Sequence, residues 1–148
     1  MDYELAFFSE ISLVDWARYI YDILDKKMEL EVNYKEHSDY ISIGCECLSF
    51  IIDTDEIIGV DVLKDVFCFE ANISIRIQIF GKTFHRGLEL LFKMLSIIVK
   101  EKIEDFILLE NGSEVILKRI NGDIYTYIQK GYDTDFPFGL LEKEIKVI

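Results

Sequence analysis

The segment from Phe67 to Phe80, FCFEANISIRIQIF, constrains the fold more than any other part of the chain. Every odd position is apolar, and the even positions from Glu70 to Gln78 are polar. A period of two over this length is typical of a β-strand with one buried and one solvated face. The isoleucines on the apolar side suit a pleated strand. Such a strand needs a second layer to cover its apolar face.

The segment that follows Gly81 supplies this cover. Residues Lys82 to Lys102 have the periodicity of an amphipathic helix, with polar side chains opposite an apolar stripe. The stripe consists of Phe84, Leu88, Leu91, Phe92, Leu95, Ile98 and Val99. A strand followed by a helix and further strands predicts an α+β fold built in layers.

The N-terminal part repeats this order. Tyr3 to Phe8 is predicted as a strand, and a helix is predicted to begin at Ser12, with Asp15 adding an acid to its first turn. One face of that helix is apolar and carries Leu13, Trp16, Ala17, Ile20, Ile23 and Leu24. We therefore expect both helices to pack in the same way.

A hairpin is predicted after the first helix. Glu29 to Tyr34 and Tyr40 to Leu48 both alternate, and a polar turn separates them. The segment from Ser49 to Val66 shows no clear period, and we interpret it as a long acidic loop with room for one helical turn.

Two Asn-Gly pairs organise the C-terminal part. Asn111-Gly112 and Asn121-Gly122 separate the alternating segments 106–110, 114–120 and 124–129. Asn-Gly between such segments is typical of tight hairpin turns, because both residues accept a positive φ. The sequence thus predicts a three-stranded meander. A loop over 130–139 and a short helix or edge strand over 140–148 follow.

These elements predict one α+β domain that spans residues 1–148. Its antiparallel sheet is expected to have about six to seven strands, with two helices packed on one face. The other face of the sheet is expected to be left half polar.

The chain has 28 acidic and 16 basic residues and a formal net charge of −12. This charge limits the classes of molecule that it is expected to bind. An acidic surface repels phosphate backbones and anionic lipids, so nucleic acid and membranes are poor partners. A basic protein is a better one. The alternative is that the excess of acid only keeps the domain soluble.

The three cysteines, at positions 45, 47 and 68, are an odd number and lie in apolar segments. They fit free buried thiols in a reducing compartment. The acidic N-terminus lacks the basic region of a secretory signal, and no apolar run is long enough to cross a bilayer. We expect a soluble cytoplasmic protein.

No motif for catalysis, a metal or a cofactor is evident. His37 and His85 are the only histidines, and neither lies in a recognisable nucleophile motif. Cys45-x-Cys47 lacks further ligands at the spacing of a zinc site, and Gly81-Lys82-Thr83 lacks the first glycine of a phosphate loop. We expect a protein without metal or cofactor. An enzyme that pairs His37 or His85 with a carboxylate stays an alternative.

Two acidic segments are the candidate partner-binding surfaces. In an interface, acidic side chains attract and orient a basic partner, and aromatic side chains supply buried contact area. The candidate residues are Asp53, Asp55, Glu56, Asp61, Asp65, Tyr132, Asp133, Asp135 and Phe136. The alternative is that both segments are ordinary solvated loops.

The stretch from Leu108 to Arg119, LLENGSEVILKR, resembles the immunity proteins of bacterial swarming-inhibition toxins. They carry a similar late strand, Asn-Gly turn and strand ending in basic residues. The chain is also similar to them in length, in an opening Tyr-x-Leu strand at Tyr3, and in a mid-chain alternating strand before a long helix.

This resemblance implies a small cytoplasmic protein that binds and neutralises one cognate toxin, often a nuclease domain, without catalytic residues of its own. We therefore expect a binding protein that occludes a basic toxin domain. A homo-oligomeric interaction module that pairs through its half-polar sheet face or an edge strand is a further alternative.

Overall fold

The computed structural model describes residues 1–53, 60–128 and 136–148, with the side chains of 60 and 61 left out. Its strands form one sheet in the order β2-β3-β4-β5-β1-β6-β7-β8-β9, and all neighbours are antiparallel except β8 and β9. The strands are β1 (Asp2–Phe7), β2 (Asn33–Glu36), β3 (Tyr40–Gly44), β4 (Leu48–Asp53), β5 (Ile73–Ile79), β6 (Phe106–Glu110), β7 (Glu114–Ile120), β8 (Asp123–Thr126) and β9 (Ile145–Val147). The predicted α+β class is confirmed.

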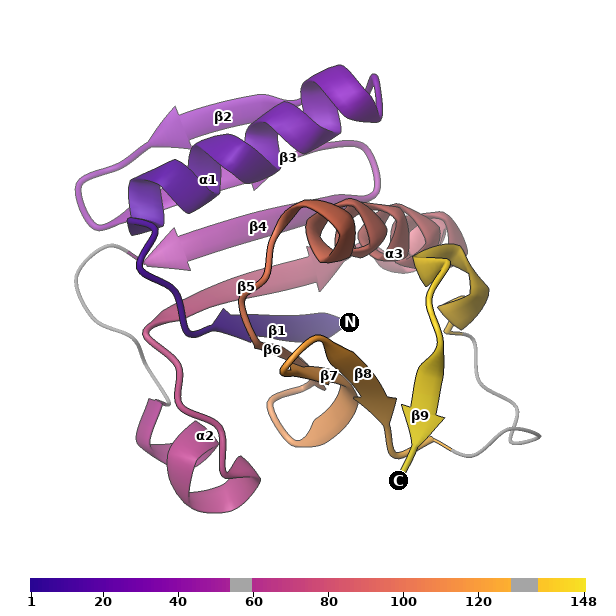
Figure 1. The fold of residues 1–148 in the computed structure, drawn as a ribbon. Helices are drawn as coiled ribbons and strands as arrows, with labels where there is room; N and C mark the ends of the chain where they lie inside the picture. The colour runs from indigo at the N-terminus through magenta and orange to yellow at the C-terminus, as the bar shows by residue number, and fades with distance from the viewer. Residues whose placement is uncertain (54–59, 129–135) are drawn as a thin grey trace.

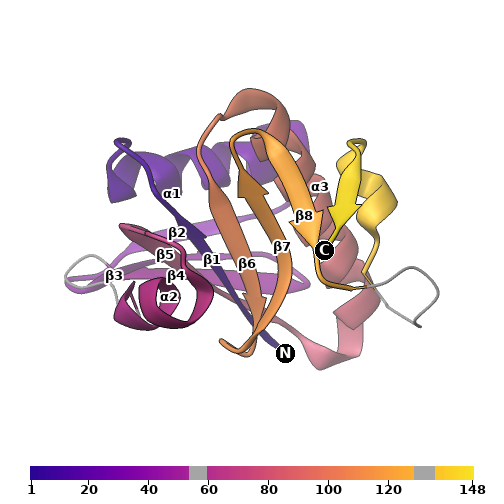
Figure 2. The ribbon, with the colours of Figure 1, turned by 60° about the horizontal axis from the view of Figure 1, so that its bottom comes forward.

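Helices lie on both faces of this sheet. They are α1 (Leu13–Asp22), α2 (Val60–Phe67) and α3 (Phe84–Glu101), with a π-helical turn η1 (Ile23–Lys27) and the 3₁₀ turns η2 (Gly81–Thr83) and η3 (Phe138–Leu141). α1 and α3 cover one face, as the sequence predicts, and α2 lies on the other (Figures 1 and 2). Within the described residues, no helix has the length and apolarity that crossing a membrane requires.

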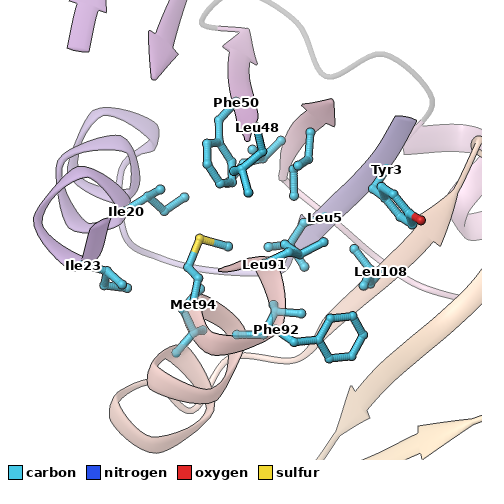
Figure 3. Close-up of a cluster of buried hydrophobic side chains, with 14 of the residues drawn as sticks. Tyr3, Leu5, Ile20, Ile23, Leu48, Phe50, Leu91, Phe92, Met94 and Leu108 are labelled. Atoms are coloured by element: carbon cyan, nitrogen blue, oxygen red, sulfur yellow. The ribbon is translucent and has the colours of Figure 1, made fainter. Parts of the chain in front are cut away.

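The main core lies between the sheet and the α1–α3 layer. Figure 3 shows Leu91 and Met94 of α3 and Ile20 of α1 among apolar side chains from the strands. Trp16 of α1 is fully buried and stacks on Phe7 of β1, with ring centroids 4.3 Å apart. Burying such large apolar side chains is the main term that stabilises this layer.

Polar contacts define the ends of the two covering helices. The Ser12 hydroxyl accepts a hydrogen bond from the Asp15 backbone N–H at 3.1 Å, which confirms the predicted start of α1. At the end of α3, the buried guanidinium of Arg119 donates to the backbone carbonyl oxygens of Val99 and Glu104. Val99 lies in the last turn of α3, where carbonyl groups lack a partner within the helix.

The predicted strand over 67–80 is only partly right. Strand β5 begins at Ile73, because the chain leaves α2 at Phe67 and turns at Cys68, whose φ is 53°. The alternation before Ile73 has a different cause. Phe69 and Ala71 are buried against Leu63 on the α2 face of the sheet rather than in the main core.

The hairpin and loop predicted between residues 29 and 66 are wrong in detail. The expected strand 40–48 ends at Gly44, and a second strand, β4, runs from Leu48 to Asp53 where a loop was expected. The alternation of β3 extends through Cys45 and Cys47 and so hides the turn, after which the buried positions shift by one residue to Leu48, Phe50 and Ile52. The strand expected over 29–34 is shifted to 33–36, and α2 replaces the end of the loop.

The C-terminal meander β6-β7-β8 is confirmed. Both Asn-Gly turns have positive φ at both residues, with values of 51° and 70° at Asn111 and Gly112 and of 51° and 87° at Asn121 and Gly122. The last segment contains both alternatives, a 3₁₀ turn followed by edge strand β9. Because β4 and β9 add to the predicted strands, the sheet has nine strands rather than the expected six to seven.

Candidate functional site

A groove of about 910 Å³ opens at one end of the helix layer, and we call it the acidic groove. Three segments that are far apart in the sequence form it: η1 with the chain that follows, the β3–β4 turn, and the first turns of α3. Its lining residues are Asp25, Glu29, Leu30, Glu31, Val32, Asn33, Cys45, Glu46, Cys47, Arg86 and Leu90.

Backbone contacts hold the walls of the acidic groove in place. Glu29 has a φ of 53°, which turns the chain after η1, and the Leu30 N–H donates to the Leu24 carbonyl oxygen at 2.9 Å. Across the groove, the Cys45 N–H donates to the Leu48 carbonyl oxygen at 3.0 Å, which closes the turn that carries Glu46. These bonds fix the position of the backbone from which the acidic side chains extend.

Gly87 brings α3 close enough to form the third wall. A Cβ at this position would lie 2.4 Å from Cγ2 of Ile79 and 3.2 Å from the Cys47 carbonyl oxygen. Real Cβ atoms do not approach other atoms so closely, so only glycine permits this contact without a shift. The first turns of α3 therefore pack directly against β5 and the β3–β4 turn.

The charge of the acidic groove is strongly negative. Asp25, Glu29, Glu31 and Glu46 face one cation, Arg86, which pairs with Glu89 at 3.4 Å. None of these four carboxylates forms an ion pair with a lysine or arginine among residues 1–53, 60–128 and 136–148. A concave surface lined by one sign of charge attracts ions of the other sign.

The floor of the acidic groove is apolar. Leu90 and Cys47 are 3% and 2% exposed, and the half-buried Leu30 and Val32 pack against the main core. An apolar floor beneath acidic walls suits lysine and arginine, whose hydrocarbon stems pack on apolar surface while the charged ends meet carboxylates.

The residues predicted as a partner site lie elsewhere. Asp53 ends β4 on the α2 face and pairs with Arg76 at 3.2 Å, which offsets its charge. Asp65 is exposed on α2. Phe136 is half-buried, and its ring contacts Tyr3 and Phe92, so it packs against the core rather than standing free.

The other predicted site residues lie outside the described residues. These are Asp55, Glu56, Tyr132, Asp133, Asp135 and the side chain of Asp61. The structure does not bring the two candidate segments together where it describes them: α2 and η3, which adjoin them, lie on opposite sides of the molecule (Figures 1 and 2). Sequence reasoning missed Asp25, Glu29, Glu31 and Glu46, because only the fold brings their segments together.

Neither histidine lines the acidic groove. His37 stacks on Tyr40 with ring centroids 4.2 Å apart and shares a hydrogen bond of 3.1 Å with the Ser42 hydroxyl. His85 is exposed at the start of α3, with its ring at the edge of Phe84. The contacts of His37 are those of a stacked and hydrogen-bonded surface side chain, and the ring of His85 is exposed to solvent.

The three cysteines are free, but the expectation that they are buried is right only for Cys47: Cys45 is half-buried, and Cys68 is exposed. Burial raises the pKa of the Cys45 thiol, so it is a poor nucleophile at neutral pH. No group of three or more ligating side chains in the described part of the chain is placed to hold a metal ion.

The α2 face carries two further depressions. One lies over β4, β5 and β1 and is mostly polar, with Asp2, Glu4, Arg76 and Gln78 among its lining residues. The other, which we call the α2 groove, has a volume of about 590 Å³ and lies between the end of α2 and the meander. It is lined by Val66, Phe67, Cys68, Ile107, Ser113, Glu114, Val115, Ile116, Lys118, Tyr127 and Ile128.

No protein-family model matches the chain, and neither a curated protein nor a solved structure is significantly similar to it.

Proposed function

We propose that this chain is a toxin-neutralising immunity protein, which binds a basic toxin domain through the acidic groove and occludes the toxin's active site. The observation that carries the proposal is the set of four carboxylates in the acidic groove that lack an ion-pair partner among the described residues. The net charge of −12 and the resemblance of residues 108–119 to immunity proteins support it.

The acidic groove offers two contributions to such a complex. Its uncompensated charge attracts a basic partner from a distance and raises the association rate. Once contact is made, a lysine or arginine of the toxin enters the groove, where its stem packs on Leu90 and Val32 and its charge meets Glu31 and Glu46. A nuclease domain suits this role because it carries basic residues to bind phosphates.

The first experiment identifies the partner. The protein is used to capture proteins from the native cell, and the C-terminal domain of any large secreted protein encoded beside it is tested directly for binding. We expect this domain to be basic, to bind with a rate that falls as salt rises, and to lose toxicity when both proteins are co-expressed. Failure of the neighbouring toxin domain to bind, together with unchanged toxicity, would contradict the proposal.

The second experiment tests the groove. A variant with Glu29, Glu31 and Glu46 replaced by lysine should associate at least tenfold more slowly with the toxin domain, because the three carboxylates that attract it are reversed. A matched control replaces the exposed acids Glu10, Asp39 and Glu144 by lysine, which changes the net charge equally at positions outside the acidic groove.

The control distinguishes local from overall charge. If both variants slow association equally, the total charge matters and the groove does not. If neither variant changes the rate, electrostatic attraction has no part in binding. Circular dichroism and thermal unfolding of each variant check that the fold is retained.

A further inference from the structure

The α2 face of the sheet is open over five strands, and we call this surface the open shelf. Helix α2 packs against β6, β7 and one end of β1. Strands β2, β3, β4 and β5 and the start of β1 present side chains on this face that are exposed or half-buried. In the order β2-β3-β4-β5-β1, β4 is the central strand of the open shelf.

One row of side chains crosses the open shelf from edge to edge. The strand pairing places Lys35 opposite Ser42, Ser42 opposite Ile51, Ile51 opposite Arg76, and Arg76 opposite Glu4, without a β-bulge in any of these four pairs of strands. Residues directly opposite each other in an antiparallel sheet have their side chains on the same face. The row therefore has a lysine at the β2 end, an isoleucine at its centre on β4 and a glutamate at the β1 end.

This row points away from the main core. The residues next to it along the strands pack into or against the core instead, and they include Tyr34, Phe50 and Ile77. Lys35 and Glu4, at the two ends of the row, form no ion pair with any residue that the structure describes. The Glu4 carboxylate accepts a hydrogen bond from the Ser74 hydroxyl at 2.8 Å, which holds it on this face.

Glu4 lies in a depression of about 480 Å³ at one side of the open shelf. The charged residues that line this depression are Asp2, Glu4 and Arg76, and Arg76 already pairs with Asp53 at 3.2 Å. The two remaining carboxylates make the depression negative. Lys35 is exposed on the edge strand at the opposite side of the shelf, so one surface carries both a negative depression and a free cation of the kind that fits it.

A two-fold axis that runs parallel to β4 over Ile51 makes the open shelf complementary to itself. Rotation about this axis places the β2 side of one copy over the β1 side of the other, so Lys35 of each copy faces Glu4 of the other. Each Ile51 then meets its symmetry mate. An axis across the strands would place Lys35 over Lys35, which repulsion between like charges disfavours.

We propose that the open shelf is a homodimer interface whose occupant is a second copy of this chain, with Lys35 of each copy seated in the negative depression of the other. The two sheets then face each other with their strands aligned, as in a β-sandwich. The two Lys35–Glu4 pairs set the register, and Ile51 supplies apolar contact at the axis. Because the rest of the shelf is polar, this dimer is weak and reversible.

The first test measures the mass of the full chain in reducing buffer, by light scattering and sedimentation over a wide range of concentration. We expect the mass to rise from 17.4 kDa toward twice this value as the concentration increases. A monomer at every concentration would overturn the proposal.

A charge exchange tests the two-fold arrangement. Lys35→Glu and Glu4→Lys should each weaken the dimer on the order of tenfold, because like charges then face each other, and the double variant should restore it. Lys93→Glu is the matched control for Lys35→Glu, since Lys93 is an exposed lysine on α3. Equal losses from these two variants would show that total charge matters and reject the open shelf. Additive loss in the double variant would exclude this register.

Cross-linking tests the position of the axis in a Cys68→Ser background, which removes the exposed native thiol. A short thiol-reactive cross-linker should join two copies of Ile51→Cys, because the two thiols meet at the axis. Asn33→Cys is the control, since β2 is two strands from β4 and a thiol there lies about 20 Å across the interface from its symmetry mate. Equal yields from the two variants would reject the axis over β4. None of these measurements uses a toxin, so they succeed or fail independently of the proposed function.

Discussion

The acidic groove and the α2 groove differ in the range over which they act on another molecule. The first gathers four uncompensated carboxylates, and its attraction to a basic partner extends to about 8 Å at physiological salt. The second is apolar with charges that cancel, and it favours a partner only on contact. The comparison teaches that one acidic chain carries both a strongly charged depression and one whose charged lining residues cancel.

The two grooves also differ in what holds them. The acidic groove is framed by α3 and by the main core, in which Leu91 and Leu48 are fully buried. The α2 groove has one wall on a short helix, which rests on the small cluster of Ala6, Leu63, Phe69, Ala71, Ile107 and Leu109. We therefore expect the first groove to be as stable as the whole fold and the second to be held more weakly.

The largest expected effect compares these two supports directly. Leu91→Ala removes a fully buried side chain from the main core, and Leu63→Ala removes a 2% exposed one from the small cluster. We expect a loss of about 4 kcal/mol of unfolding free energy for Leu91→Ala and about 2 kcal/mol for Leu63→Ala, because a site near the surface collapses more easily around the missing atoms. Denaturant unfolding measures both values.

The Leu63→Ala variant should leave binding of a basic partner at the acidic groove unchanged. Equal losses of stability from the two variants would show that the two supports are one cooperative unit.

A smaller effect is expected at Gly87, where the acidic groove depends on a close approach of α3. Gly87→Ala should destabilise the fold by about 1–3 kcal/mol, because the new methyl group displaces Ile79 or the helix itself. It should also slow association with a basic partner, since α3 forms one wall. Gly44→Ala is the control, because a Cβ there would meet nothing within 4 Å. Thermal unfolding and association rates check the result.

The smallest expected effects concern how stability depends on pH. They have opposite signs at Glu101, in the helix layer, and at Glu110, in the meander. In the helix layer, hydrogen bonds from Lys27 and Tyr19 hold the pKa of Glu101 below its usual range. The stability it contributes is present above the unfolded-state pKa of about 4.3 and is lost as pH falls through the lower folded value. In the meander, burial and then the charge of Glu114 raise the pKa of Glu110. Ionisation of Glu110 therefore lowers the stability of the fold as pH rises through the pKa that Glu110 has in the folded state.

Tyr19→Phe and Glu110→Gln separate these contributions. Tyr19→Phe should reduce stability near pH 7 by less than about 1 kcal/mol, with a smaller difference at pH 3. Glu110→Gln should increase stability slightly at pH 7 and leave it unchanged at pH 3, since the native glutamate is then protonated. Unfolding curves at both pH values test the signs, and a gain at pH 7 from Tyr19→Phe would contradict the first.

Local chemistry made much of the fold predictable. The Asn111-Gly112 turn, the Ser12 cap and the helix over 84–101 depend on neighbours in the sequence, and all three are confirmed. The β3–β4 turn was missed because Cys45 and Cys47 extend the alternation of β3 into the turn. The start of β5 was missed because Phe69 and Ala71 continue its alternation but are buried on the α2 face. Periodicity reports that a side chain is buried but does not report against which layer.

The acidic groove was beyond sequence reasoning for a related reason. Asp25 and Glu31 belong to η1 and the chain that follows it, and Glu46 belongs to the β3–β4 turn, so only the fold brings these carboxylates to one groove beside α3. The acidic composition predicted the sign of the surface charge, and the fold decides where the charge is uncompensated. The loop acids expected to bind instead include Asp53, whose charge is offset by Arg76.

The guanidinium of Arg119 carries a consequence for how the molecule opens. One side chain from β7 holds the last turn of α3 and the backbone at Glu104, so the meander cannot separate from the helix without exposing several hydrogen-bonding groups at once. Amide protons of β7 and of the end of α3 should therefore exchange with deuterium at a common rate, as one unit. An Arg119→Met chain would divide that unit and let the C-terminal strands fluctuate on their own.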